Sequence, residues 1–283
     1  MAFTIPNLLT HYTDLHGLVG IITSRQVWCS NIRFLNDSKE YVHGLEAIIA
    51  AFQVATDESG DGTPELRAFV NAGLLNTLQQ AADDPMVDAP CVASFSMLSD
   101  DLSQWRGYGG DPGICVRFDG ESLSERAGKS NAFLFPCFYD VDNLSQMSEN
   151  VTKVVNRQPL GGTLDDLDSF AQVLNSGLDE IVVYCLKVSC LFKEPAFAAE
   201  QEWRIVCNTA QDRIGFRQRG RILVPYMAVE LWAESSECPI REIGIGPGEH
   251  QRLNEAAIRC LLDANGLGKV IVNTSKVPFR KFQ

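Results

Sequence analysis

The amino-acid sequence predicts an α+β fold, because strand-like and helical segments are mixed along the chain without the strict alternation of α/β folds. Short apolar runs that suit buried strands recur from residue 91 onward, and longer segments with apolar residues at helical spacing lie between them. At 283 residues the chain exceeds the usual domain of roughly 100 to 150 residues. We therefore expect one elaborated domain over residues 1–283, with helical insertions at about 56–85 and 141–190.

The N-terminal segment predicts a helix followed by a short strand. Thr13 suits the N-cap of a helix whose apolar positions keep the helical period as far as Ser24. Residues 27–30 then form a strand-like run. The tripeptide His11-Tyr12-Thr13 therefore falls where a strand turns into a helix.

Two more helices are expected before residue 85. Asp37 followed by Glu40 is a capping box, and the helix after it has a buried side formed by Tyr41, Leu45, Ile48, Ile49 and Phe52. A polar loop at 56–63 separates this helix from one that begins at Pro64 and ends near Ala82. The acidic residues of the loop lack the spacing of a helix-loop-helix calcium site, so we interpret it as a solvated loop.

The rest of the chain predicts a sheet that a final helix and strand complete. Residues 141–163 are irregular and polar, and a helical pattern follows from about 164 to 188. The final helix is expected near 250–264. The expected strands are 91–96, 113–118, 133–139, 203–207, 222–232, 242–245 and 270–272.

Composition and charge exclude several classes of protein. Hydrophobic residues make up 45% of the chain and charged residues 21%, and no run approaches the roughly 18 apolar residues of a membrane helix. The N-terminus lacks the basic and apolar regions of a signal peptide, so we expect a soluble cytoplasmic protein. The net charge of −12 makes duplex nucleic acid an unlikely partner, although a local basic patch can still bind a nucleotide.

The cysteines and histidines do not form a recognisable metal site. The nine cysteines are an odd number and lie mostly in apolar runs, which favours buried thiols. No CxxC pair occurs, and the four histidines lack the spacing of zinc ligands. The sequence predicts no structural metal.

Several motifs carry a resemblance to known proteins. In order they are His11-Tyr12-Thr13, Phe34-Leu35-Asn36-Asp37-Ser38-x-Glu40, Ser94-Phe95-Ser96 with Gln104-Trp105-Arg106-x-Tyr108, Glu202-Trp203-Arg204, Ile243-Gly244-Ile245-Gly246-Pro247 and Ser275-Lys276-Val277-Pro278-Phe279-Arg280. By these the chain is identified as a member of a bacterial family of unknown function, DUF2971. The same order resembles ADP-ribosyltransferases of the His-Tyr-Glu type, which include poly(ADP-ribose) polymerases and bacterial DNA-modifying toxins. That resemblance implies an ADP-ribosyltransferase-like mixed sheet core with flanking helices, and NAD as the substrate.

The first motif suits the ribose and nicotinamide of NAD. The resemblance implies that His11 hydrogen-bonds a ribose hydroxyl, with Tyr12 and Thr13 beside the nicotinamide amide. The alternative is that His11 packs at the end of a strand and Thr13 only caps the helix.

The second motif supplies aromatic rings. In the polymerases a strand aromatic and a tyrosine after a Ser-rich helical turn sandwich nicotinamide, and Phe95 and Tyr108 stand in those places here. Ser94 and Ser96 flank Phe95 and are assigned to the same cofactor site. Phe95 replaces the family's tyrosine and lacks its hydroxyl. The alternative is that Trp105 and Tyr108 are core aromatics.

The third motif resembles the Glu-x-Glu of arginine-directed transferases, and Glu202 is our choice of catalytic carboxylate. A fixed anion stabilises the oxocarbenium-like state that develops when the bond between nicotinamide and ribose breaks. Strand alternation places Glu202 with Arg204 on one face and Trp203 and Ile205 on the other. A salt bridge between Glu202 and a basic neighbour is the alternative.

A group of arginines is the candidate phosphate site. Five occur close together in an acidic chain, and we assign Arg204 and Arg217 to the pyrophosphate of NAD. A solvated hairpin with surface salt bridges is the alternative, since only some of these side chains share one face. The glycines at 244–248 are interpreted as a strand-to-helix turn because Pro247 lacks an NH group. The arginines are Arg204, Arg213, Arg217, Arg219 and Arg221.

Two functions follow from these residues. The first is an NAD-consuming enzyme, either an ADP-ribosyltransferase acting on an unidentified macromolecule or an NAD glycohydrolase, as suits a toxin or phage-defence effector. The alternative is a non-catalytic module that keeps the fold and senses a nucleotide. A Ser- or Cys-based hydrolase has little support, because no nucleophile lies in a recognisable elbow motif.

Overall fold

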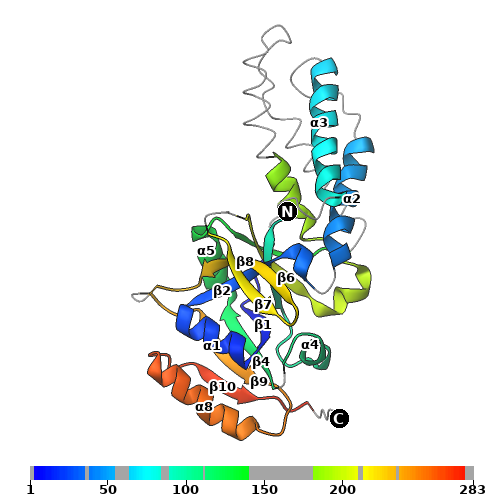
Figure 1. Cartoon of the computed structure of the whole chain (residues 1–283). Coiled ribbons are helices and arrows are strands. Elements are labelled where there is room, and N and C mark those ends of the chain that lie inside the picture. Colours follow the sequence, from blue (N-terminus) through cyan, green and yellow to red (C-terminus); the bar gives the residue numbers. More distant parts are fainter. Residues whose placement is uncertain are drawn as a thin grey trace.

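The computed structural model describes residues 3–35, 38–54, 64–83, 89–110, 112–139, 181–209, 213–233 and 236–277. Within them a ten-stranded mixed sheet is flanked by helices, which confirms the predicted α+β class (Figure 1). Several predicted features lie outside these residues: the cap at Asp37, the loop at 56–63, most of the insertion at 141–190, and residues 278–280 of the last motif. The division into one domain with insertions stays a prediction.

Most predicted elements are present with similar bounds, whereas the helix at 120–129 and the strand at 215–219 were not predicted. The strands are β1 (Leu8–Asp14), β2 (Gln26–Asn31), β3 (Cys91–Ser96), β4 (Gly113–Asp119), β5 (Phe133–Pro136), β6 (Glu202–Cys207), β7 (Gly215–Arg219), β8 (Ile222–Glu230), β9 (Ile240–Ile245) and β10 (Ile271–Thr274). The helices are α1 (Leu15–Ser24), α2 (Ser38–Val54), α3 (Pro64–Asp83), α4 (Leu102–Gly107), α5 (Gly120–Lys129) and α8 (Gln251–Ala264), with 3-10 turns η1 (Ile32–Phe34) and η2 (Pro195–Glu200). Residues 181–189 are also helical.

The sheet branches at β3. One edge of β3 pairs with β6 along its whole length, and β5 pairs with the far side of β6. The other edge is shared, because Thr10 of β1 pairs with Ser96 at one end and Ser30 of β2 pairs with Val92 at the other. From there β1 continues into β4, β9 and β10, whereas β2 continues into β8 and β7. The two arms therefore leave a notch between β1 and β2.

Two apolar cores lie on the two faces of this sheet. The larger contains the buried sides of α1, α5 and α8 together with inward residues of most strands. The smaller lies under α2, α3 and residues 181–189, and includes Val92 and Val206. Figure 1 shows α8 at one end of the molecule beside β9 and β10, and α2 and α3 at the opposite end. Burial on both faces explains the nearly continuous apolar runs of β3, β4 and β6.

The start of α1 corrects one prediction. Thr13 does not cap the helix, because β1 stays paired with β4 as far as Asp14 and Thr13 is part of that strand. Asp14 is the N-cap, and its carboxylate accepts a hydrogen bond from the backbone NH of Gly17 at 2.7 Å. The helix ends where Arg25 adopts a left-handed conformation with φ of 60°.

Helix α4 was not predicted as a separate element, and it positions part of the cleft described below. The side chain of Asp101 caps its N-terminus. The ring of Trp105 packs against three glycines, and a Cβ added to Gly113 or to Gly246 would lie 2.9 Å from that ring. These glycines are therefore needed for close packing against Trp105, beyond the turn role that the sequence suggested for Gly246.

The third predicted strand also differs in extent. It was expected to run to residue 139, but β5 ends at Pro136 and Phe138 instead forms an isolated bridge with Phe192. The arginine-rich segment forms the hairpin of β7 and β8, as its alternative interpretation suggested.

Candidate active site

The notch between β1 and β2 opens into a cleft of about 1020 Å³. This is slightly above the roughly 300–1,000 Å³ that small-molecule sites usually occupy. Strands β1, β2, β3 and β7, helix α1 and the segments around Tyr108 and Glu200 form its walls. The cleft is lined by every residue that the sequence assigned to the site: His11, Tyr12, Thr13, Ser94, Phe95, Ser96, Tyr108, Glu202, Arg204 and Arg217. The roles of these residues remain predictions.

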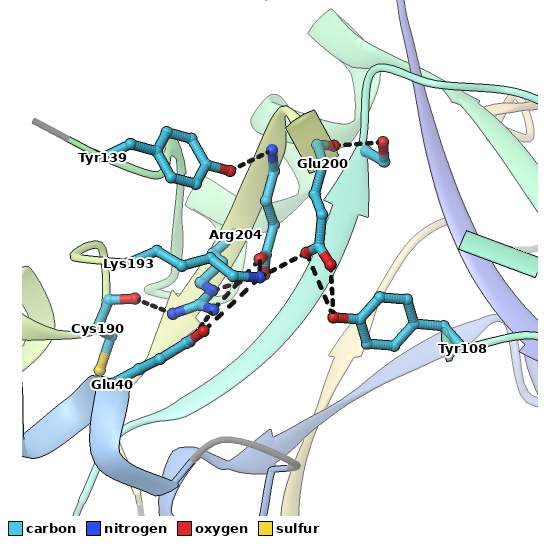
Figure 2. Close-up of polar contacts among 9 residues, drawn as sticks. Glu40, Tyr108, Tyr139, Cys190, Lys193, Glu200 and Arg204 are labelled. Atoms are coloured by element: carbon cyan, nitrogen blue, oxygen red, sulfur yellow. Dashed lines mark hydrogen bonds and ion pairs between the residues drawn. The ribbon is translucent and has the colours of Figure 1, made fainter. Parts of the chain in front are cut away.

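One wall of the cleft contains a buried ionic network (Figure 2). Arg204 is its centre, and its Nε and Nη2 donate to Glu202 Oε1 and Glu40 Oε2, each at 2.7 Å. Its Nη1 donates to the backbone carbonyl of Cys190 at 2.6 Å. Lys193 Nζ donates to Glu202 Oε2 and, at 2.6 Å, to Glu200 Oε2. The alternation that put Glu202 and Arg204 on one face of the strand is confirmed, and the predicted alternative of a salt bridge at Glu202 is present.

Burial and mutual attraction oppose each other in this network. Burial raises the pKa of Glu202, but the charges of Arg204 and Lys193 outweigh it and lower that pKa to about 2. For Glu40 burial outweighs the same two cations, so its pKa is raised. Attraction to Glu202 overcomes burial at Lys193 and raises the pKa of its ammonium. Glu202 is therefore ionised throughout the physiological range.

The network with its carboxylates ionised carries an excess negative charge. Three carboxylates, Glu40, Glu200 and Glu202, face two cations, Lys193 and Arg204, which leaves a formal charge of −1. Of the three carboxylates, Glu200 has the most exposed side chain, at 16% against 5% and 6% for the other two. Glu200 is therefore the most solvent-accessible carboxylate of the network.

Tyr108 and Ser96 hold Glu200 in place. The hydroxyl of Tyr108 donates to Glu200 Oε1 at 3.0 Å, and Tyr108 is 40% exposed (Figure 2). The hydroxyl of Ser96 donates to the backbone carbonyl of Glu200 at 2.7 Å and accepts from Leu98 N at 3.0 Å. Burial raises the pKa of Tyr108, so the phenol stays protonated and able to donate.

His11 borders the cleft, and its ring packs against Phe95. Its Nδ1 lies 2.9 Å from the carbonyl oxygen of Ser94. Because a carbonyl only accepts, Nδ1 carries the proton in the neutral ring and Nε2 keeps a free lone pair. Burial lowers the pKa of His11, and the nearby charge of Arg217 lowers it further, despite the opposing hydrogen bond to Ser94. The neutral form is thus favoured at pH 7.

Phe95 and Tyr12 differ from their sequence-based roles. The ring of Phe95 is 1% exposed and packs against His11 and Phe118, so it supports His11 and does not offer an open face opposite Tyr108. Strand alternation explains this, since Phe95 points into the larger core with Trp203. Tyr12 is 8% exposed, and its hydroxyl bonds the loop before α4.

The five arginines divide among three locations. Arg204 is 2% exposed and bonded within the network, which does not suit the phosphate contact assigned to it. Arg217 and Arg219 line the cleft from β7, and Arg217 Nη2 donates to Ser30 Oγ at 2.7 Å. Arg213 and Arg221 are exposed and are not part of the lining. The cleft thus has an acidic wall at Glu200 and a basic wall at β7.

Sequence reasoning missed several residues of the site. Glu40 and Glu200 lie inside motifs that were recognised, but Glu40 was assigned only to a capping box and Glu200 was not assigned to the site. Lys193 precedes η2 in a segment with no motif, and no local signal indicates that its ammonium reaches Glu202. Ser30 was likewise predicted only as part of a strand, and Gln104 only as part of a motif.

The described residues lack two features. They contain no group of three or more His, Cys, Asp or Glu side chains arranged to hold a metal ion. None of the helices in the described ranges combines the length and apolarity that a membrane-spanning segment requires.

Comparison with known proteins gives a family and a weak structural similarity. No curated protein matches the chain. Among solved structures, the chain is similar to "Thermus sp. 2.9 DarT in complex with ADP-ribosylated ssDNA", at 12% identity, covering 98% of both chains with a TM-score of 0.34. So low a TM-score supports no conclusion about activity. The family model described as "Protein of unknown function (DUF2971)" matches residues 104–205, which run from α4 through the Glu200 and Glu202 segment. Residues 104–205 are therefore a DUF2971 domain, the family that the sequence motifs predicted.

Proposed function

We propose that this protein consumes NAD, breaking the bond between nicotinamide and ribose and passing ADP-ribose to an acceptor or to water. The observation that carries the proposal is the polarity of the cleft. Glu200, the most exposed carboxylate of the anionic network, lies on one wall, and Arg217 and Arg219 lie on another. NAD has the matching polarity, since its nicotinamide ring is cationic and its pyrophosphate is anionic.

The proposed chemistry uses both walls. When the glycosidic bond breaks, its electron pair goes to the nicotinamide nitrogen and positive charge develops on the ribose. The anionic network stabilises that charge, with Glu202 fixed behind and Glu200 facing the cleft. The free lone pair on His11 Nε2 accepts from a ribose hydroxyl, and Arg217 holds a phosphate. The resemblance noted from the sequence adds the proposal that the sheet core is ADP-ribosyltransferase-like.

One observation favours a second candidate function. Both oxygens of Glu202 already accept hydrogen bonds, from Arg204 and Lys193, and its side chain is only 6% exposed. A carboxylate so fully paired also suits a module that binds a nucleotide without chemistry.

One experiment separates the two functions. Purified protein is incubated with NAD, and free nicotinamide and ADP-ribose are measured by chromatography while the melting temperature is followed. Nicotinamide release supports the enzyme. A raised melting temperature without nicotinamide supports the binding module, because a ligand of the native state stabilises it by mass action. If millimolar NAD produces neither nicotinamide release nor a raised melting temperature, both functions are rejected.

A further inference from the structure

The Nε2 atom of Gln104 is buried beside the cleft without a hydrogen-bond partner. The residue is 4% exposed, lines the cleft, and its Nε2 makes no hydrogen bond. A buried donor without an acceptor is costly, and nearly all such groups in folded proteins are paired. An unpaired one that borders a binding cleft is therefore a place where a ligand supplies the missing acceptor.

The fold holds this amide firmly. Asp101 caps α4 and accepts from the backbone NH groups of Ser103 and Gln104, at 2.8 and 3.3 Å. The next residue, Trp105, is locked among glycines by ring contacts. Gln104 is therefore presented by a rigid turn, as recognition of a small ligand requires.

Its neighbours indicate what the ligand is. Tyr108 is the C-cap of α4, its backbone NH donates to the carbonyl of Gln104 at 2.9 Å, and both residues line the cleft. The phenol ring of Tyr108 is 40% exposed, and its hydroxyl is bonded to Glu200. The cleft therefore combines an amide donor with an accessible aromatic ring and a carboxylate. A planar ring that carries a carbonyl group and a positive charge fits all three.

We infer that Gln104 recognises the carboxamide of the nicotinamide ring, with Nε2 donating to the carboxamide oxygen while the ring lies against Tyr108. This inference rests on the proposed function and deepens it, because it names the residue that selects the leaving group. A site built around a hydrogen bond rejects an analogue that lacks the acceptor, since its own buried donor then stays unpaired.

The test uses Gln104→Met, which keeps the length of the side chain and removes the amide. The probes are nicotinamide and 3-methylpyridine, which has the ring without the carboxamide. We expect the wild-type protein to bind nicotinamide about tenfold more tightly than 3-methylpyridine, a difference of roughly 1.4 kcal/mol. In Gln104→Met we expect that preference to disappear. We expect the melting temperature to be unchanged or raised, because the variant no longer buries an unpaired donor.

Gln251→Met is the matched control. Gln251 Nε2 donates to Gly246 O at 2.9 Å, so this variant is expected to melt at a lower temperature and to keep the preference for nicotinamide. If wild-type protein binds NAD and nicotinamide but Gln104→Met keeps the preference, the inference is overturned and the proposed function stands. A drop of several degrees in the melting temperature of Gln104→Met would also overturn it, by showing that the amide supports the fold. Wild-type protein that binds neither NAD nor nicotinamide would overturn the proposed function and this inference together.

Discussion

The carboxylates of Glu200 and Glu202 differ in burial. Replacing each of them by glutamine therefore separates an effect on stability from an effect on catalysis. Glu202 has a side chain only 6% exposed and bonds both Arg204 and Lys193. Without that charge Arg204 keeps Glu40 and Lys193 keeps Glu200, but each cation loses one buried charge-assisted bond and faces the new amide NH2 group, which costs about 3 kcal/mol. At roughly 2 to 4 °C per kcal/mol for a chain of this size, Glu202→Gln is expected to lower the melting temperature by about 10 °C.

Glu200→Gln removes the same charge at less cost to the fold. Lys193 keeps its bond to Glu202 and a contact of 3.8 Å with Glu40, so both cations stay paired. We expect a loss of stability of about 1 kcal/mol. If Glu200 faces the developing charge on the ribose, nicotinamide release should fall about 100-fold, equivalent to about 2.7 kcal/mol in the barrier. Glu202→Gln is expected to slow nicotinamide release as well, but this variant also has the lower melting temperature given above.

Nicotinamide release and melting temperature are measured on the same preparation of each variant. Glu194→Gln is the control, because Glu194 is exposed next to Lys193 in the chain and does not line the cleft. It should change neither quantity. Wild-type turnover in Glu200→Gln would refute the assignment of the acidic wall, and a wild-type melting temperature in Glu202→Gln would refute the description of the network.

Further predictions concern the other parts of the cleft. Arg217→Met should weaken NAD binding about tenfold by loss of a phosphate contact, and leave nicotinamide binding unchanged, whereas Arg221→Met on the same hairpin should alter neither; titration calorimetry with both ligands checks this. Burial holds the pKa of His11 below 6.5, so the unfolded chain takes up the proton first and stability falls as pH drops below that value. Melting curves at pH 5 to 8 should show this loss in the wild type and a smaller one in His11→Gln; equal curves would contradict a buried neutral ring. Gly246→Ala places a Cβ 2.9 Å from Trp105 and should cost about 1 to 3 kcal/mol, measured by denaturant unfolding.

Local patterns in the sequence were enough to identify most elements. The spacing of apolar residues indicates whether a segment is a helix or a strand and which side of it is buried, and this spacing can be read from neighbouring residues. The buried side of α2, with Tyr41, Leu45, Ile48 and Ile49, and the pairing of Glu202 with Arg204 on one face of β6 were therefore predictable. The recurring order of motifs was also enough to name the family over residues 104–205.

Only the tertiary structure decided how these elements form a site. The branch at β3 makes the cleft, and it depends on pairing between strands far apart in the sequence. Lys193 pairs with Glu202, and Glu40 pairs with Arg204, from separate segments of the chain, because buried charges need partners. The missing partner of Gln104 and the enclosed ring of Phe95 are likewise invisible in the sequence, since hydrogen-bond satisfaction and burial are set by the whole fold, whereas periodicity is set by adjacent residues.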